Sequence, residues 1–148
     1  MPKHFNTAGP CQADIHYMLP SIDRLPNLRN IIDQRGYFVI HAPRQTGKTT
    51  AMMALAQQLT ASGDYTAIVL SLETGAAFKH DPVLAQKYIL NHWWNTVRVT
   101  LPPDLQLPKR VAVEQEVGTT ELDLQTVLQL WTVASPRSLV VFLDEIDS

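Results

Sequence analysis

The fold of this chain is decided by one stretch, Ala42-Pro43-Arg44-Gln45-Thr46-Gly47-Lys48-Thr49-Thr50. It follows an apolar run, Tyr37-Phe38-Val39-Ile40, and precedes a segment whose apolar residues have helical spacing. This order predicts a strand, a phosphate-binding loop and a helix. In a chain of this length the pattern, with Ala or Gly first and Gly-Lys-Ser/Thr last, arises by chance with a probability on the order of one per cent.

The residue types in this stretch are those that a phosphate site needs. Backbone N–H groups of such a loop converge on the β- and γ-phosphates, and Gly47 lets the chain approach them without a Cβ. Lys48 supplies a cation for the same oxygens, and the Thr49 hydroxyl is placed to bind Mg²⁺. The helix that begins near Gly47 points its positive dipole end at the anion. Ala42 replaces the usual first glycine, a mild variant that keeps the tight exit from the strand possible if its φ stays negative. The alternative is an ordinary strand-to-helix turn that contains Gly-Lys-Thr by chance.

Composition favours one globular domain. The chain has 148 residues, of which 45% are hydrophobic and 18% charged. Its formal net charge of -2 provides no overall attraction to nucleic acid or to an anionic membrane. No apolar run approaches the roughly 18 residues of a membrane helix, and the N-terminus has no apolar signal core. We therefore expect a cytoplasmic protein without a membrane partner.

The periodicity of the chain predicts an irregular arm followed by one α/β domain. Residues 1–20 show no sustained period and form the arm, and residues 21–148 form the domain. Strands are predicted at residues 37–42, 65–72 and 138–143. Helices are predicted at residues 21–34, from about residue 48 to residues 62–63, at 81–100, and from 124 to a point before Pro136. Residues 101–118 contain three prolines and are expected to be irregular.

Three local patterns refine this prediction. The apolar strand 37–42 is typical of a sheet covered on both faces, and with the next helix and strand it makes a βαβ unit. Residues 120–123 have the spacing of a capping box, which places the N-cap at Thr120. Trp93 and Trp94 lie on one helical face, where packing is favoured over base stacking because no basic cluster accompanies them.

The last predicted strand ends in two carboxylates, Asp144 and Glu145. Asp144, at the carboxyl end of the strand, is placed to hold Mg²⁺ opposite Thr49. Glu145 follows it and is placed to orient and polarise an attacking water as a general base. An isolated Asp-Glu pair is a weak signal, because most such pairs are solvated loop charges. Its position after an apolar strand makes it the counterpart of the phosphate loop.

Together the two motifs resemble Walker A and Walker B of the AAA+ ATPases. Walker A corresponds to residues 42–49 and Walker B to Val140-Val141-Phe142-Leu143-Asp144-Glu145-Ile146-Asp147. Arg24-Leu25-Pro26-Asn27-Leu28, leading into residues 37–44, resembles the AAA-like ATPases related to origin-recognition and STAND switch proteins. The resemblance implies a three-layer P-loop NTPase fold with a mostly parallel sheet, and ATP and Mg²⁺ as cofactors.

The resemblance also implies roles for individual residues. Lys48 and Glu145 are the implied catalytic residues, and Thr49 and Asp144 are the implied metal ligands. The implied nucleotide contacts are Ala42, Pro43, Arg44, Gln45, Thr46, Gly47, Lys48, Thr49 and Thr50. The implied activity is Mg²⁺-dependent ATP hydrolysis that drives remodelling or a conformational switch.

In that family a further strand lies between the loop strand and the Walker B strand and comes later in the sequence. The resemblance therefore implies that residues 21–148 are a partial P-loop ATPase domain, truncated after Walker B. We expect such a fragment to be poorly stable alone and not competent for full turnover. A nucleotide-gated binding or signalling module without appreciable hydrolysis is the main alternative, and a small-molecule kinase is a weaker one. Self-association through the ATPase domain and a nucleic-acid or protein partner are left open.

Overall fold

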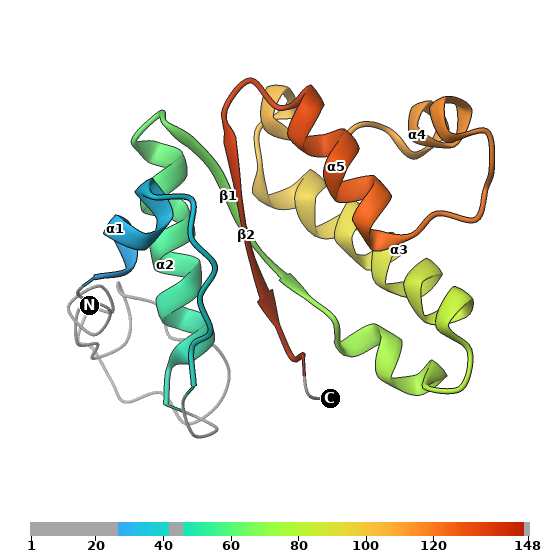
Figure 1. The fold of residues 1–148 in the computed structure, drawn as a ribbon, viewed down its shortest axis with the longest axis horizontal. Coiled ribbons are helices and arrows are strands. Elements are labelled where there is room, and N and C mark those ends of the chain that lie inside the picture. The colour runs from blue at the N-terminus through green and yellow to red at the C-terminus, as the bar shows by residue number, and fades with distance from the viewer. Residues whose placement is uncertain (1–26, 42–45, 147–148) are drawn as a thin grey trace, which may run out of the picture.

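The centre of the structure is a pair of parallel strands. The structure, a computed structural model, describes residues 27–41 and 46–146, and within them β1 (Tyr65–Ser71) pairs in parallel with β2 (Ser138–Asp144). The strands are in register from end to end, so their carboxyl ends lie at the same level. Helices pack on both faces of the pair (Figure 1). Both strands agree with the prediction, and the mixture of helices with a parallel strand pair is compatible with the expected α/β class.

The helix after the phosphate loop, α2, covers one face of the sheet. It extends over Lys48–Ala61 and is joined on this face by α1 (Leu28–Asp33). Its apolar residues are buried at the predicted helical spacing: Met52, Leu55, Ala56 and Leu59. Ala67 of β1 and Phe142 of β2 pack against them. We call this cluster the α2 core.

A second group of helices covers the opposite face. The elements on this side are η2 (Glu73–Phe78), α3 (Pro82–Thr100), η3 (Pro103–Leu105), α4 (Arg110–Val117) and α5 (Leu124–Ala134). Ile68 and Leu70 of β1 belong to this cluster, because successive side chains of a strand face opposite sides. We call it the α3–α5 core. Its fully buried members include Leu90, Trp93, Val97, Leu105, Val113, Val127 and Trp131.

The tryptophans are packing residues, as predicted. Trp93 and Trp131 are 1% and 0% exposed, and each indole N–H donates a hydrogen bond to a backbone carbonyl. Trp94 is partly buried, and its indole N–H donates to the Pro108 carbonyl. The Arg110 guanidinium lies 5.8 Å from the centroid of the Trp94 ring. The indole N–H groups of all three tryptophans are therefore hydrogen-bonded within the protein.

The predicted strand at residues 37–42 is wrong over its described part, residues 37–41. This segment is not paired with β1 or β2, so the predicted βαβ unit is not formed within the described residues. Tyr37 is fully exposed and Val39 is 73% exposed, so the segment is not covered on both faces. Phe38 packs against the α2 core, with its ring centroid 6.0 Å from that of Phe142. Apolar side chains place this segment against α2, but a strand also needs a hydrogen-bonding partner.

The expectation of an irregular segment at residues 101–118 is wrong in part. The segment contains η3 and α4. Pro102, Pro103 and Pro108 lie at or before the starts of these helices, where proline is compatible with helical geometry. Leu105 and Val113 are buried in the α3–α5 core. These two helices are too short to show an apolar period in the sequence. Their tertiary contacts therefore specify them.

One predicted helix start lies outside the described residues, and one N-cap differs from the prediction. Within the described residues α1 begins at Leu28, whereas the predicted helix 21–34 extends into residues 21–26, which lie outside them. The N-cap of α5 is Asp123, not Thr120. The Asp123 carboxylate accepts hydrogen bonds from the Thr126 N–H at 2.8 Å and from the Thr126 hydroxyl at 2.7 Å. Aspartate is itself among the preferred N-cap residues, so it needs no capping box.

Removing the Asp123 cap is expected to destabilise the protein in a pH-dependent way. The Thr126 N–H and hydroxyl hold the pKa of the Asp123 carboxyl below its usual value. The stabilisation is therefore present above the unfolded-state pKa of about 4 and is lost as the pH falls through the lower folded-state pKa. We expect Asp123→Ala to lower the free energy of unfolding by about 1 kcal/mol at pH 7, and by less in acid.

Urea unfolding at pH 7 and at acidic pH measures this difference. Asp123→Asn is the matched control, because asparagine caps helices about as well and does not titrate. A deficit in Asp123→Ala that is the same at both pH values would contradict the role of the carboxylate.

Candidate functional site

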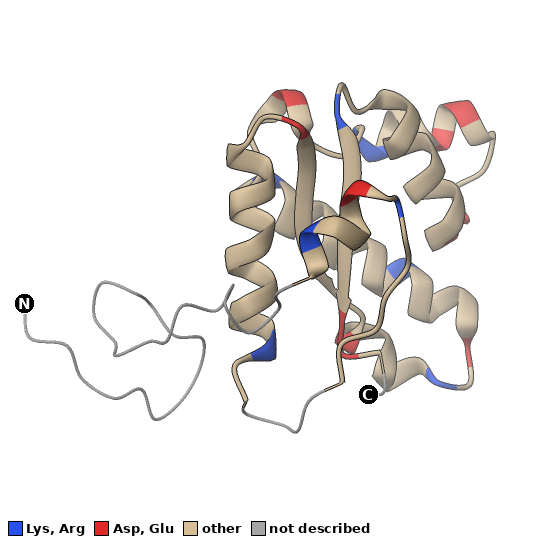
Figure 2. Cartoon of the chain, turned by 60° about the vertical axis from the view of Figure 1, so that its left-hand side comes forward, with Lys and Arg blue, Asp and Glu red and all other residues tan. Residues whose placement is uncertain are grey.

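The two predicted motifs meet at one end of the sheet. The amino end of α2 and the carboxyl end of β2 lie at the same end of the molecule (Figure 2). The Thr49 hydroxyl donates a hydrogen bond of 2.6 Å to Oδ2 of Asp144, across 95 positions of sequence. Thr49 is the second residue of α2, and Asp144 is the last residue of β2. The structure thus joins the two residues that the sequence assigns to one metal ion.

The start of α2 points backbone N–H groups out of the end of the helix. Gly47 is the N-cap with a left-handed φ of 81°, a conformation that favours glycine. No side chain caps this end, and the first turn contains no acidic residue. The first N–H groups of a helix have no partner within the helix, so they can donate to an anion. Lys48 is the first residue of the helix and is partly buried.

Asp144 is buried and held by two donors. The residue is 7% exposed to solvent. Oδ2 accepts from the Thr49 hydroxyl, and Oδ1 accepts from the Glu145 N–H at 3.0 Å. A buried carboxylate is costly unless hydrogen bonds replace its hydration, and these two donors do so. The carboxylate is therefore fixed in position at the end of β2.

Glu145 has an unusual backbone conformation. Its φ is 58°, in the left-handed region that residues with a Cβ rarely adopt. Such a conformation costs on the order of 1–3 kcal/mol and is often associated with functional sites. The residue is exposed at the end of the sheet, immediately after Asp144. Nothing in the sequence pattern indicates this conformation.

The structure describes some of the predicted site residues and not others. Thr46, Gly47, Lys48, Thr49 and Thr50 form the start of α2 or directly precede it. Ala42, Pro43, Arg44 and Gln45 lie outside the described residues. The nucleotide contacts expected of these four residues remain predictions.

The donor set suits a hard cation. Thr49 and Asp144 both present oxygen atoms, which Mg²⁺ prefers, and Mg²⁺ commonly takes few protein ligands and fills its other positions with water and phosphate. Among residues 27–41 and 46–146 there is no group of three or more His, Cys, Asp or Glu side chains that could hold a metal by themselves. The residues present therefore fit a metal that is shared with a phosphate ligand.

Sequence reasoning missed two contacts at the end of β1. The Leu72 N–H donates to the Asp144 carbonyl at 3.0 Å, and the Trp93 indole N–H donates to the Ser71 carbonyl at 2.9 Å. Ser71 pairs with Asp144 in the sheet. The carboxyl ends of parallel strands lie at the same edge of a sheet. An expected parallel pairing of β1 with β2 could therefore have indicated that Ser71 and Leu72 lie beside Asp144.

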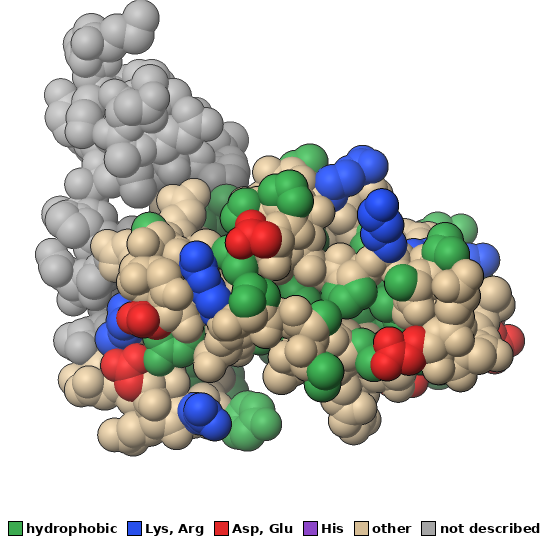
Figure 3. Space-filling view, turned by 90° about the horizontal axis from the view of Figure 1, so that it is seen from above, with side chains coloured by type: hydrophobic (Ala, Val, Ile, Leu, Met, Phe, Trp, Pro, Cys, Tyr) green, Lys and Arg blue, Asp and Glu red, His purple; other side chains and the backbone are tan. Residues whose placement is uncertain are grey.

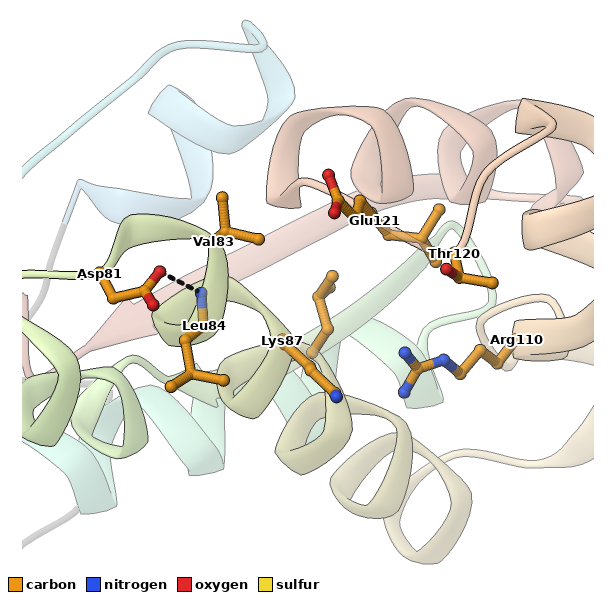
Figure 4. Close-up of a pocket in the computed structure, with 9 residues that line it drawn as sticks. Asp81, Val83, Leu84, Lys87, Arg110, Thr120 and Glu121 are labelled. Carbon is orange, nitrogen blue, oxygen red and sulfur yellow. Dashed lines mark hydrogen bonds between the residues drawn. The ribbon is translucent and has the colours of Figure 1, made fainter.

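A cavity of about 430 Å³ lies away from these residues. It is enclosed by α3, the start of α4 and residues 120–122 (Figure 4). Two of its charged residues already have partners, since Asp81 caps α3 through the Leu84 N–H and Arg110 pairs with Glu114 at 2.7 Å. None of the predicted site residues lines it. The candidate site is therefore defined by the contacts of Asp144 and not by this cavity.

Replacing Thr49 with valine is expected to destabilise the protein without any ligand. Thr49→Val keeps the shape of the side chain but removes one of the two donors to a buried carboxylate. Hydrogen bonds to charged groups contribute about 1.5–3 kcal/mol, so we expect a loss of that size in the free energy of unfolding. Denaturant unfolding in the absence of Mg²⁺ and nucleotide measures it. Thr49→Ser retains the hydroxyl and should be close to the unmodified protein; equal stability of the valine variant would argue against the contact.

Comparison with known proteins assigns no function to this geometry. No family model matches the chain, no curated protein matches it, and no solved structure matches it. The functional argument therefore depends on the motifs in the sequence and on the contacts among the described residues.

Proposed function

We propose that this chain is the nucleotide-binding part of a P-loop ATPase, in which ATP binds with Mg²⁺ and Glu145 activates water for hydrolysis. The observation that carries the proposal is the hydrogen bond between Thr49 and Asp144. The two motifs assign these residues to one metal ion, and their distance in the sequence gives no reason for them to meet otherwise. The fold proposed is the three-layer P-loop NTPase fold, which is supported by a parallel strand pair with helices on both faces.

Different residues of the site bind the phosphates and the metal ion. The N–H groups of the first turn of α2 and the Lys48 ammonium hold the β- and γ-phosphates by hydrogen bonds and charge. The Thr49 hydroxyl and the Asp144 carboxylate hold Mg²⁺, directly or through its water. When bound, Mg²⁺ neutralises charge on the phosphate oxygens. Because its proton is donated to Asp144, the Thr49 oxygen keeps lone pairs available for the metal.

The water-activating role falls to Glu145. It directly follows Asp144, so the end of β2 presents one carboxylate for the metal and another for the nucleophile. A general base must reach the proton that it abstracts, either directly or through one water. The left-handed backbone of Glu145 sets the direction in which its side chain leaves the sheet. The strain at this residue supports a functional reading of it.

A nucleotide-gated binding module without appreciable hydrolysis is the second candidate. It is favoured by the exposure of Glu145, whose side chain is not enclosed beside the buried Asp144. Enclosure excludes competing water and strengthens electrostatic catalysis, so an exposed base argues for slow turnover. Both candidates share the ATP and Mg²⁺ site and differ only in the step after binding.

One face of the molecule carries a mixed distribution of charge. On the face shown in Figure 3, acidic and basic side chains are interspersed rather than gathered by sign. Among the described residues, none of the helices combines the length and apolar character that a membrane span requires. Self-association, nucleic acid and protein partners stay outside the proposal.

Lys48 is expected to be essential for nucleotide binding. Lys48→Ala removes the cation at the start of α2, and we expect ATP affinity in the presence of Mg²⁺ to fall by about 10–100-fold. Isothermal titration calorimetry measures it. Lys79→Ala is the control, because Lys79 is an exposed lysine at the end of η2 and has no role in the proposal. Equal losses in the two variants would contradict a specific phosphate contact.

Glu145 is expected to separate binding from turnover. Glu145→Gln keeps the size of the side chain but cannot accept the proton of water, so hydrolysis should fall by about 10²–10⁴-fold while ATP affinity stays unchanged. Phosphate release under single-turnover conditions measures the chemical step. Glu116→Gln, an exposed change on α4, is the control. Unchanged hydrolysis in Glu145→Gln would remove this residue from the mechanism.

A further inference from the structure

We propose that Trp93 is a positioning residue for the metal site, although it lies in the α3–α5 core. This inference rests on the proposed binding of Mg²⁺ and ATP. The Trp93 indole holds the end of β1, the end of β1 holds the backbone of Asp144, and Asp144 is thereby held against Thr49.

Three hydrogen bonds form this series, and covalent bonds join one to the next. The Trp93 indole N–H donates to the Ser71 carbonyl at 2.9 Å. Ser71 is the last residue of β1 and pairs with Asp144 in the sheet, and the next residue, Leu72, donates its N–H to the Asp144 carbonyl at 3.0 Å. The Asp144 carboxylate then accepts from the Thr49 hydroxyl at 2.6 Å. The series connects the core on one face of the sheet to α2 on the other.

The position of Trp93 in the series explains why it matters. Strand ends lose the ladder of hydrogen bonds that holds the middle of a strand, so they are the part of a sheet most open to fraying. The Trp93 ring is 1% exposed and is enclosed by the α3–α5 core, so its N–H is a fixed donor. Metal ligands need positions accurate to about 0.5 Å, which a loosened strand end does not provide.

The chain contains a matched control for this contact. The Trp131 indole is equally buried, at 0% exposed, and it also donates to a backbone carbonyl, that of Leu105, at 3.2 Å. Leu105 lies in η3 and is not part of the strand pair. Trp131→Phe therefore loses the same kind of bond and leaves a similar space in the same core. The two variants differ in whether the freed carbonyl adjoins Asp144.

The test compares Trp93→Phe with Trp131→Phe in the full chain. Binding of a fluorescent ATP analogue is titrated with Mg²⁺, and its affinity without Mg²⁺ is measured in chelator. We expect the half-saturating Mg²⁺ concentration to rise about fivefold in Trp93→Phe, which corresponds to about 1 kcal/mol, and not in Trp131→Phe. Affinity without metal should stay unchanged in both. A general loss of stability would instead weaken all of these measurements in the two variants alike.

A second readout needs no nucleotide. We expect hydrogen exchange of the Leu72 amide to accelerate about fivefold in Trp93→Phe and to stay unchanged in Trp131→Phe, because only the first variant releases the end of β1. Equal Mg²⁺ dependence or equal Leu72 exchange in the two variants would overturn the inference. If the unmodified chain does not bind Mg²⁺ and ATP, the proposed function fails, and the Leu72 exchange still decides whether Trp93 anchors the strand end.

Discussion

The candidate site depends on one hydrogen bond, from the Thr49 hydroxyl to the Asp144 carboxylate. A carboxylate that leaves water needs donors in the protein, and Asp144 has two, one from α2 and one from the next residue of its own chain. The bond forms only if the start of α2 and the end of β2 reach the same place. The packing of both elements against the sheet is therefore a condition for the site.

The two cores supply this condition from opposite sides. The α2 core holds the helix that carries Thr49 against Ala67 and Phe142 of the sheet. The α3–α5 core holds the other face through Ile68 and Leu70, and it reaches the end of the sheet through the bond from Trp93 to the Ser71 carbonyl. Side chains of β1 alternate between the two cores, so the position of this strand is fixed by contacts on both faces of the sheet. Asp144 is therefore expected to respond to those residues of the two cores that hold the strand end, as Trp93 does through the Ser71 carbonyl.

The segment at residues 37–41 shows the limit of pattern reading. It is as apolar as the strands of the sheet, and Phe38 does pack against the α2 core. Its backbone, however, is not part of the sheet that β1 and β2 form. Side-chain pattern predicts which residues leave water, while a strand is defined by hydrogen bonds to another segment. That partner is not encoded within the segment itself.

The sequence by itself determined what depends on neighbouring residues. Helical spacing identified α2, α3 and α5, apolar runs identified β1 and β2, and the residue types of the two motifs indicated phosphate and metal chemistry. Only the tertiary structure decided the absence of pairing at residues 37–41, the short helix α4, the left-handed backbone of Glu145 and the bonds that Thr49 and Trp93 donate. The physical reason is that periodicity and motifs are local, whereas these features arise from contacts between segments far apart in the chain.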